Sequence, residues 1–233
     1  MYQCVAEVLR CEAVNEFVYL VELELPEAVD YIPGQYLLAV MGERDQRPFS
    51  IASTPADGQR VVLHIGASPD NPYAWEVLEH IRSHGELNIS LPHGEAGYDP
   101  DRQRPLLLIA GGTGFSYTWS ILQAHLARES EQPVTLFWGV RQASDLYMHQ
   151  QLTTLASQYG HFEYIPVLEK QDDADWVGHQ GLVLNAVTDH VDDIARYDVY
   201  IAGRFEMVRV ARDTFHALGL PKQQLFGDAL SFI

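Results

Sequence analysis

Apolar residues recur with the spacing of β-strands through the first hundred residues of the chain. Phe17, Tyr19, Val21 and Leu23 alternate with neighbours that include the polar Glu22 and Glu24, which is the period of a strand with one buried face. Shorter apolar runs follow, bounded by glycine, proline and aspartate, at Tyr36–Met41, Val61–Ile65 and Leu87–Leu91. One helix is predicted among them from the helical spacing of Ala74, Val77, Leu78 and Ile81. Many short strands joined by polar turns predict an antiparallel β-barrel or sandwich.

The second half of the chain alternates strands with helices. The apolar run Leu106–Ala110 has the length and bulk of a strand buried on both faces. Later strands are predicted at Val134–Trp138, Tyr164–Leu168, Val199–Ala202 and Leu225–Phe226. The helices between them are predicted from four sets of apolar residues: Ile121, Leu122 and Leu126; Met148, Leu152, Leu155 and Ala156; Leu184, Val187 and Val191; Met207, Val210, Ala211 and Leu218. This alternation predicts a parallel sheet with helices on both faces.

A polar, turn-rich segment at residues 97–104 separates the two patterns. The sequence therefore predicts two domains, an antiparallel β-barrel over residues 1–100 and an α/β domain with a parallel sheet over residues 101–233.

Composition and charge exclude several classes of function. The net charge of −17 argues against a nucleic-acid partner, because no basic cluster offsets the repulsion from phosphates. Cys4 and Cys11 are the only cysteines, too few for a zinc or iron–sulfur site, so no metal site is predicted. No apolar run approaches the ~18 residues that span a bilayer, and the N-terminus lacks the pattern of a secretory signal. We expect a cytoplasmic protein without a membrane partner.

The glycine-rich turn Gly111–Gly114 connects the strand at Leu106–Ala110 to a helix. A strand, a glycine turn and a helix N-terminus together present backbone N–H groups that suit a phosphate. The dinucleotide fingerprint G-x-G-x-x-G fails here, because Tyr117 stands where its third glycine would be. From the turn alone, a nucleotide site and a tight turn without a ligand both remain open.

Two more glycine-bearing loops follow predicted strands of the same sheet. Gly139–Arg141 and Gly203–Arg204 each come directly after a strand, as Gly111–Gly114 does. The carboxyl ends of parallel strands lie at one edge of a sheet, where ligands of open α/β sheets bind. The three loops therefore predict a binding cleft at that edge.

Several motifs resemble those of one enzyme superfamily. Arg47–Ser53, with the sequence RPFSIAS, resembles the R-x-Y/F-S-x-x-S flavin-binding motif of the ferredoxin–NADP⁺ reductase superfamily. Gly111–Gly114 is similar to its G-G-T-G nucleotide loop, and Tyr200–Met207 lies where the family has a C-G-x-x-x-M segment. Within the superfamily, the chain most resembles the bacterial NAD(P)H:flavin oxidoreductases.

The resemblance implies a flavin-binding barrel and an NAD(P)-binding α/β domain. Ser50 would be the catalytic residue, since its hydroxyl can exchange a hydrogen bond with flavin N5. The implied flavin-binding residues are Arg47, Pro48, Phe49, Ser50, His64, Ile65, Gly66, Ala67, Ser116 and Phe232. Arg47 would neutralise a flavin phosphate or lie over the ribityl chain, with a surface salt bridge as the alternative. Pro48 and Phe49 would form an apolar wall against the ring, with core packing as the alternative, and the backbone of His64–Ala67 would contact the pyrimidine edge. The implied NAD(P)-binding residues are Gly111, Gly112, Thr113, Gly114, Arg141, Ala202, Gly203 and Arg204.

The chain departs from the family pattern at three positions. Ala202 stands where many relatives have a cysteine beside nicotinamide C4, and Ser116 stands where they usually have a proline. Many relatives end in an aromatic residue that covers the flavin. Phe232 is the candidate for that role here, with Asp228 as its acidic partner.

The resemblance also implies how the flavin is used. Only a turn separates Ser53 from Val61, whereas a tightly held FAD usually needs an added segment around its adenine. We therefore expect riboflavin, FMN or FAD to bind weakly as a substrate, with NADH or NADPH as the donor. Arg141 could pair with a 2′-phosphate, which leaves the choice between NADH and NADPH open.

Two partners for the electrons remain open. Reduced flavin would serve a flavin-dependent monooxygenase or a luciferase. The alternative is an FAD-holding reductase component that passes electrons to an oxygenase or an iron–sulfur partner protein.

Overall fold

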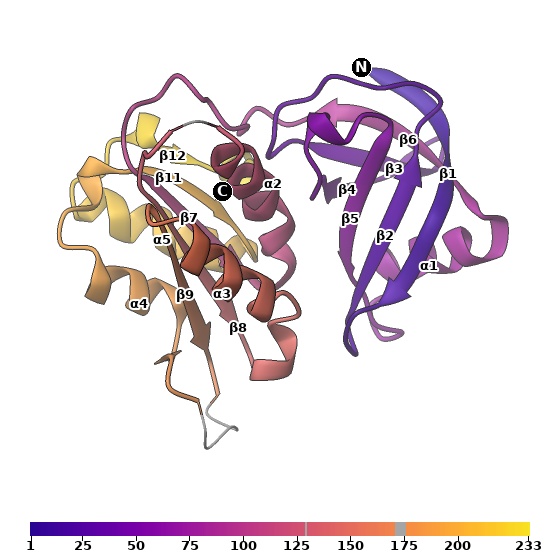
Figure 1. Cartoon of the computed structure of the whole chain (residues 1–233). Coiled ribbons are helices and arrows are strands. Elements are labelled where there is room, and N and C mark those ends of the chain that lie inside the picture. The colour runs from indigo at the N-terminus through magenta and orange to yellow at the C-terminus, as the bar shows by residue number, and fades with distance from the viewer. Residues whose placement is uncertain (129, 171–175) are drawn as a thin grey trace. The chain divides into compact units, whose positions relative to one another are not determined.

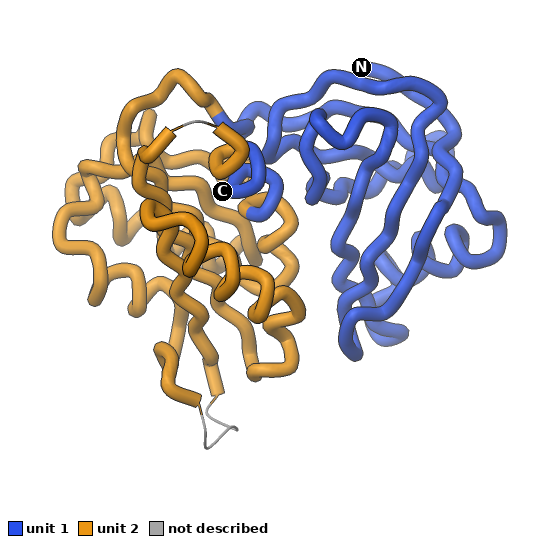
Figure 2. Tube along the Cα trace, in the orientation of Figure 1, with its two compact units in different colours: residues 1–98, 119–124 blue, residues 99–118, 125–233 orange. Residues whose placement is uncertain are grey.

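The computed structural model describes residues 1–128, 130–170 and 176–233 of the chain. It divides into two compact units (Figure 2): unit 1 comprises Met1–Tyr98 with Trp119–Ala124, and unit 2 comprises Asp99–Thr118 with His125–Ile233. The sequence predicted a single boundary, near residue 100. It did not predict that Trp119–Ala124, which lie in a helix of the second half of the chain, group with unit 1.

Unit 1 contains a curled antiparallel sheet of six strands in the order β4-β3-β6-β1-β2-β5 (Figure 1). Its strands are β1 (Tyr2–Ala13), β2 (Val18–Glu24), β3 (Tyr36–Gly42), β4 (Asp45–Ser50), β5 (Arg60–Gly66) and β6 (Glu86–His93). The outer strands of this order are joined by a bridge between Ile51, which follows β4, and Leu63 of β5. The predicted antiparallel barrel fold is confirmed.

The strand β1 was not predicted, and its residues show why. Val5 and Leu9 are 47% and 45% exposed, while Ala6 between them is fully buried. Apolar residues therefore stand on both faces of β1 and remove the two-residue period that reveals a half-buried strand.

The helix α1 (Pro72–His84) covers one part of the barrel core. Its buried residues are Ala74, Val77, Leu78 and Ile81, the four that the spacing predicted. The helix begins with a proline in its first turn and ends at Gly85, whose φ of 70° is the left-handed conformation that favours glycine.

Unit 2 contains a six-stranded sheet in the order β10-β9-β8-β7-β11-β12, and all its pairs are parallel. The strands are β7 (Leu106–Gly111), β8 (Val134–Val140), β9 (Phe162–Leu168), β10 (His179–Gln180), β11 (Asp198–Ala202) and β12 (Leu225–Phe226). From β7 the chain adds strands on one side as far as β10 and then crosses to β11 on the other side of β7. The strand order therefore reverses at β7, the place where open α/β sheets bind ligands.

Four helices connect these strands: α2 (Phe115–Leu126), α3 (His149–Gln158), α4 (Val183–His190) and α5 (Phe205–Ala217). Leu107 and Ile109 of β7 share a core cluster with buried residues of α4 and α5. On β8, Phe137 belongs to the same cluster, whereas the next residue, Trp138, stacks on Phe115 of α2. Successive residues of a strand point to opposite faces, so helices cover both faces of the sheet, as predicted.

The apolar face of α5 differs from the predicted one. Its buried residues are Val208, Ala211 and Phe215, whereas Val210 is 54% exposed and Leu218, which follows the helix, is 56% exposed. Apolar residues stand on more than one side of this helix, so their spacing alone does not show which side is buried. The buried side is the one that packs against the sheet.

Short 3₁₀ helices complete the description, at Pro55–Asp57, Gly112–Gly114, Ala143–Asp145, Ile194–Arg196, Lys222–Gln224 and Asp228–Phe232. Within the described ranges, no helix combines the length and apolar character needed to cross a membrane. The same ranges hold no group of three or more His, Cys, Asp or Glu side chains arranged to bind a metal.

Candidate functional site

The two segments implied to bind flavin are neighbours within unit 1. Arg47–Ser53 occupies β4 and the residues after it, and His64–Ala67 lies at the end of β5. The Ile51–Leu63 bridge and a 2.8 Å hydrogen bond from Ala52 N to Val62 O join them. The fold therefore brings together the two parts of the sequence-predicted flavin site.

Ser50, the predicted catalytic residue, is the last residue of β4. Its backbone is paired with Tyr36 of β3, and its side chain is half-buried. Among the described residues, no side chain or backbone group hydrogen-bonds to its hydroxyl. The Ser50 hydroxyl is thus rigidly placed by its strand and free to bond a ligand.

Ser53, the second serine of the motif, is bonded to the barrel. Its side chain is buried, its hydroxyl lies 3.1 Å from the Tyr31 hydroxyl, and it accepts a 3.0 Å hydrogen bond from Val62 N. Its carbonyl oxygen accepts a 2.6 Å bond from Ser120 Oγ, which belongs to the same unit. Ser53 therefore anchors the segment that carries Ser50.

Arg47 is buried and surrounded by acceptors. Its Nε donates to Asp45 Oδ1 at 2.8 Å, and its Nη2 donates to Asp45 Oδ2 at 2.6 Å and to Glu76 Oε2 at 2.7 Å. Its Nη1 donates to Tyr73 O. The hydrogen bond and charge of the Asp45 carboxylate raise the pKa of the guanidinium, and the hydrogen bond and charge of Arg47 lower the pKa of the Asp45 carboxyl. The predicted contact of Arg47 with a flavin phosphate or ribityl chain therefore has competitors within the protein.

Pro48 and Phe49 differ in burial because they alternate along β4. Phe49 packs against the barrel core and is half-buried, whereas Pro48 is exposed. The structure thus gives Phe49 a packing role, and a wall formed by both residues against a flavin ring stays a prediction.

The segment His64–Ala67 is mostly buried. His64 is 6% exposed, and burial lowers its pKa to about 4, so the imidazole is neutral at neutral pH. Ile65 is fully buried and Ala67 is nearly so, while Gly66 remains partly exposed. Ala67 N donates a 2.8 Å hydrogen bond to Phe17 O, which fixes the end of β5. This burial leaves little side-chain surface at His64, Ile65 and Ala67, and the flavin contact implied for the backbone of this segment stays a prediction.

In unit 2, the glycine turn after β7 packs directly on the loop after β11. A Cβ on Gly114 would collide with Ala202 O and lie 2.8 Å from Gly203 N. A Cβ on Gly111 would lie 2.6 Å from Sδ of Met207, which stands in the first turn of α5. Glycine is required here for close approach of the two loops. Two of the three predicted loops thus meet at the carboxyl edge of the sheet.

Gly112 has a different reason to be glycine. Its φ of 55° is left-handed, and a Cβ there would meet no atom within 4 Å. Trp138 Nε1 donates a 3.0 Å hydrogen bond to Gly112 O, and the Trp138 ring stacks on Phe115 at 4.0 Å. No side chain caps the N-terminus of the 3₁₀ turn at Gly112–Gly114. The N–H groups of Gly112 and Thr113 therefore remain suited to an anion.

The remaining predicted nucleotide residues border the same sheet edge. Arg141 follows β8, Arg204 follows Gly203 at the start of α5, and both side chains are exposed. Within the described residues, neither guanidinium forms an ion pair. Ala202 and Gly203 are half-buried. The edge thus combines uncapped amides with two available cations.

Three further predicted residues have less open surroundings or lie apart. Ser116 is 2% exposed in the first turn of α2, and a flavin contact by its hydroxyl stays a prediction. Phe232 is 73% exposed, with its ring edge-on to Phe205 at 6.2 Å. Burial first, and the Asp228 carboxylate second, raise the pKa of Tyr117. Asp228 therefore lies near Tyr117, and its pairing with Phe232 stays a prediction.

Sequence reasoning missed the partners of Arg47 and the contact of Met207. Asp45 stands two residues before Arg47 on the same strand, so strand alternation could have suggested that pair. Glu76 is 29 residues from Arg47, and no local pattern reveals their contact. Met207 lies within the quoted C-G-x-x-x-M segment, but only the structure shows that it covers Gly111 and Gly203.

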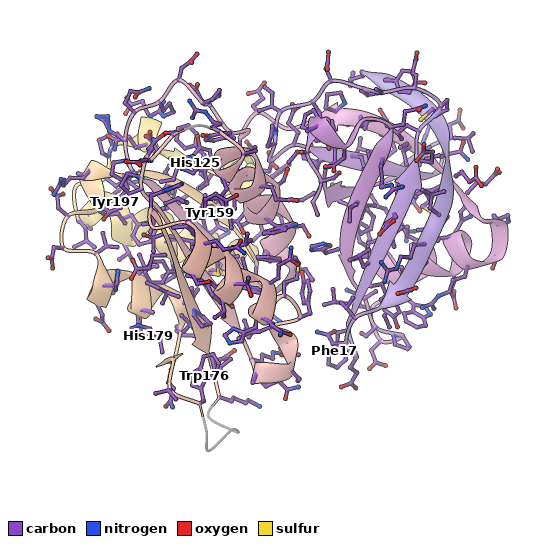
Figure 3. The ribbon with its side chains drawn as sticks, viewed as in Figure 1. Phe17, His125, Tyr159, Trp176, His179 and Tyr197 are labelled. Carbon is purple, nitrogen blue, oxygen red and sulfur yellow. The ribbon has the colours of Figure 1, made fainter. Side chains whose placement is uncertain are left out.

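A cluster of rings from α3, from β9 and from the segment after β9 was also not predicted. Trp176 and His179 are labelled in Figure 3. Trp176 Nε1 donates a 3.1 Å hydrogen bond to His179 O, and the Trp176 ring lies 5.9 Å from that of His149. His149 Nδ1 lies 3.2 Å from the Tyr164 hydroxyl. Burial lowers the pKa of His149 and raises that of Tyr164. The cluster fixes the start of α3 against β9.

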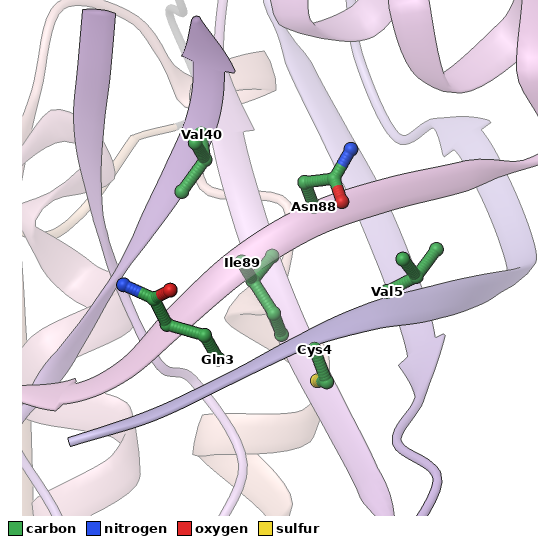
Figure 4. A pocket seen from close by; sticks show the side chains of 6 residues that line it. All are labelled: Gln3, Cys4, Val5, Val40, Asn88 and Ile89. Atoms are coloured by element: carbon green, nitrogen blue, oxygen red, sulfur yellow. The ribbon is translucent and has the colours of Figure 1, made fainter. Parts of the chain in front are cut away.

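A pocket of about 260 Å³ opens on unit 1 (Figure 4). Its walls come from β1, β3 and β6 and consist of Gln3, Cys4, Val5, Val40, Asn88 and Ile89. None of the predicted flavin residues lines it.

Comparison with known proteins places the chain in a family. It is 42% identical over 237 residues to an NAD(P)H-flavin reductase of Vibrio harveyi, with 99% of each chain covered. It is 44% identical over 236 residues to an NAD(P)H-flavin reductase of Aliivibrio fischeri, with 99% of this chain and 98% of that protein covered. The chain belongs to the NAD(P)H-flavin reductase family. The resemblance stated from its motifs is confirmed.

A family model and a solved structure also match the chain. Residues 108–213 match the model of the oxidoreductase NAD-binding domain. A solved structure of an Amycolatopsis cytochrome P450 reductase is 25% identical and has a TM-score of 0.88, with 97% of this chain and 69% of that chain covered. The NAD-binding family model thus covers the part of the chain that contains all three predicted glycine-bearing loops of unit 2.

Proposed function

We propose that this protein uses NADH or NADPH to reduce free riboflavin, FMN or FAD. The observation that carries the proposal is its full-length similarity to two proteins named NAD(P)H-flavin reductase. The reaction is the transfer of a hydride from nicotinamide C4 to flavin N5, for which a protein mainly supplies positioning.

The residues of unit 1 fit a flavin ring. The Ser50 hydroxyl, which has no hydrogen-bond partner in the described part of the chain, can donate to flavin N5 or accept from it. The anchored Ser53 holds the Ser50 segment in place. The buried, neutral His64 brings no charge to the site. The partly exposed backbone at Gly66 offers hydrogen-bonding groups to the polar edge of the ring.

The residues of unit 2 fit a dinucleotide. The uncapped N–H groups of Gly112–Gly114 suit its pyrophosphate, and Thr113 suits its ribose or carboxamide. Arg141 and Arg204 are exposed and available for further phosphate contacts. In this proposal Gly111, Gly114, Ala202 and Gly203 shape the loops that present these groups.

We propose that flavin is a substrate that leaves after reduction. Between Ser53 and Val61 the chain forms only the 3₁₀ turn Pro55–Asp57, closed by reciprocal bonds of Thr54 and Asp57. The stretch between Ser53 and Val61 is therefore too short to contain an added segment that would enclose the adenine of FAD. Gel filtration of the protein after incubation with FAD should therefore separate the two, and a stoichiometric flavin that stays bound would contradict this part.

The decisive experiment is oxidation of NADH and of NADPH by the purified protein, with and without added riboflavin, FMN and FAD. The proposal expects turnover only when a flavin is present, without a second protein. No turnover with any of the three flavins would refute it. Comparing both nucleotides in wild type and in Arg141→Ala measures the contribution of Arg141 to their discrimination.

A second candidate is a reductase component that passes electrons to an oxygenase. The observation that favours it is the structural similarity to a cytochrome P450 reductase, of which the chain covers 69%. A strict requirement for a protein acceptor, with free riboflavin not reduced, would support this alternative.

We further propose that a flavin-dependent monooxygenase or a luciferase consumes the reduced flavin. A coupled assay in which a dialysis membrane separates the reductase from a luciferase would give light only if free reduced flavin is the carrier. We also propose a cytoplasmic location, because Cys4 and Cys11 are both free thiols, which persist in reducing compartments. Cell fractionation checks the location.

A further inference from the structure

The cation of the predicted flavin motif is held by two carboxylates. Asp45 binds Arg47 through both of its oxygens, at 2.8 and 2.6 Å, and Glu76 binds Nη2 at 2.7 Å. The Arg47 side chain is 9% exposed, whereas those of Asp45 and Glu76 are 44% and 50% exposed. The surface that a ligand meets at this point is therefore the two carboxylates rather than the guanidinium.

The hydrogen-bonding capacity of Arg47 is nearly filled. A guanidinium has five N–H donors, and Asp45, Glu76 and Tyr73 O accept from four of them. The Tyr73 ring lies 5.0 Å from the guanidinium carbon and covers it further. A phosphate binds arginine best through two parallel N–H groups, and two are not available here.

The charge of the cluster also opposes a phosphate. One guanidinium and two carboxylates carry a net charge of −1. A phosphate monoester carries roughly −1.5 to −2 at pH 7, so its approach to this cluster is repulsive. A ribityl hydroxyl is uncharged, and it can accept from the remaining N–H or donate to a carboxylate.

We propose that Asp45 and Glu76 are specificity-determining residues that keep Arg47 from binding flavin phosphates, so that the enzyme favours riboflavin over FMN and FAD. The inference rests on the proposed function and on the flavin contact of the Arg47–Ser53 segment. It assigns the discrimination to two carboxylates outside the R-x-Y/F-S-x-x-S motif.

The test compares kcat/KM for FMN with kcat/KM for riboflavin in wild type, Asp45→Asn, Glu76→Gln and the double variant. We expect wild type to favour riboflavin, and we expect the FMN-to-riboflavin ratio to rise on the order of tenfold in the double variant, mainly through a lower KM for FMN. Asp45→Glu, which keeps the charge, should keep the ratio within about threefold of wild type, well short of that change.

Glu79→Gln is the matched control. Glu79 lies on the same helix, one turn after Glu76, and bonds Trp75 Nε1 instead of Arg47. The Glu79→Gln substitution removes one negative charge, as Glu76→Gln does, and should leave the FMN-to-riboflavin ratio of kcat/KM unchanged. An unchanged FMN-to-riboflavin ratio in a folded double variant would overturn the proposal. A rise in Glu79→Gln equal to that in Glu76→Gln would also overturn it, because the effect would then come from net charge alone.

Wild-type enzyme supplies an independent measurement if the variants do not fold. Added salt screens the repulsion between FMN and the cluster, so the FMN-to-riboflavin ratio should rise with ionic strength. A ratio that does not change with salt would overturn the proposal. Failure of the wild type to reduce any flavin is a different result, which would refute the proposed function itself.

Discussion

Ser50 and Ser53 stand three residues apart in one motif, and their side chains have different surroundings. The Ser53 hydroxyl is bonded to the Tyr31 hydroxyl and to Val62 N, whereas the half-buried Ser50 hydroxyl has no partner among the described residues. The hydrogen bonds of Ser53 stabilise the segment after β4, whereas the Ser50 hydroxyl is held at the end of β4 and is available to a ligand. The two serines therefore allow binding and stability to be separated by single substitutions.

Ser50→Ala should lower kcat for riboflavin reduction at least about tenfold, because one hydrogen bond to the reacting ring is worth roughly 1.5 kcal/mol. Its free energy of unfolding should remain close to that of wild type. Ser53→Ala should show the reverse, a loss of about 1 to 3 kcal/mol of stability from unsatisfied buried partners. Steady-state kinetics and urea denaturation measure both effects, and an unchanged kcat in Ser50→Ala would contradict its assigned role.

Gly114→Ala should destabilise the protein by about 2 kcal/mol and raise KM for the nucleotide. The added Cβ collides with Ala202 O and forces apart the two loops that meet there. Gly160→Ala is the control, since a Cβ at that position meets no atom within 4 Å. Thermal unfolding and nucleotide titration would measure the difference, and equal behaviour of the two variants would show that loop packing is not the reason for Gly114.

At the scale of elements, residue spacing predicted most helices and strands because burial on one face imposes a period. The helix α1 has the four buried residues that its spacing predicted. The prediction was wrong for the buried side of α5, where Val210 is exposed and Val208 is buried, and it missed β1, whose exposed face also carries apolar residues. Both α5 and β1 carry apolar residues on two faces, and the element that packs against each one determines which face is buried.

The corrected face of α5 gives a direct prediction. Val208→Ala should lower the free energy of unfolding by about 2 kcal/mol, because it removes two buried methyl groups from the core of unit 2. Val210→Ala on the same helix should change it by no more than about 0.5 kcal/mol. Denaturant unfolding of both variants measures the contrast, and a larger loss for Val210→Ala would restore the face that spacing predicted.

At the scale of the whole molecule, two compact units share a chain with a net charge of −17. The middle of α2 belongs to unit 1, where Ser120 Oγ and Gln123 Nε2 donate to Ser53 O and Ala52 O at 2.6 and 2.7 Å. Within unit 1, Ser120 and Gln123 therefore hold the segment after β4. Stability of the flavin motif is coupled through these bonds to a helix from the second half of the sequence.

Buried His64 should make stability depend on pH. Its folded pKa of about 4 lies below the ordinary value of about 6.5 expected in the unfolded chain. The unfolded state therefore binds a proton first as pH falls below about 6.5, and stability declines until the folded pKa is reached. Between pH 7.5 and pH 5, the loss from this residue should be about 2 kcal/mol.

His64→Gln should flatten this part of the profile. Unfolding free energies of wild type and variant at both pH values isolate the His64 contribution from the changing net charge, which affects both proteins alike. Parallel profiles would show that His64 is not the group responsible.

The sequence by itself determined the fold class, the family and the main motifs of this protein. Periodic burial, glycine conformation and motif spacing are local properties, so they can be recognised along a single chain. The tertiary structure alone decided that Glu76 binds Arg47 from 29 residues away, that Gly114 packs on Ala202, and that Trp119–Ala124 group with unit 1. These contacts depend on which elements become neighbours, and the long-range packing that sets neighbours has no period along the chain.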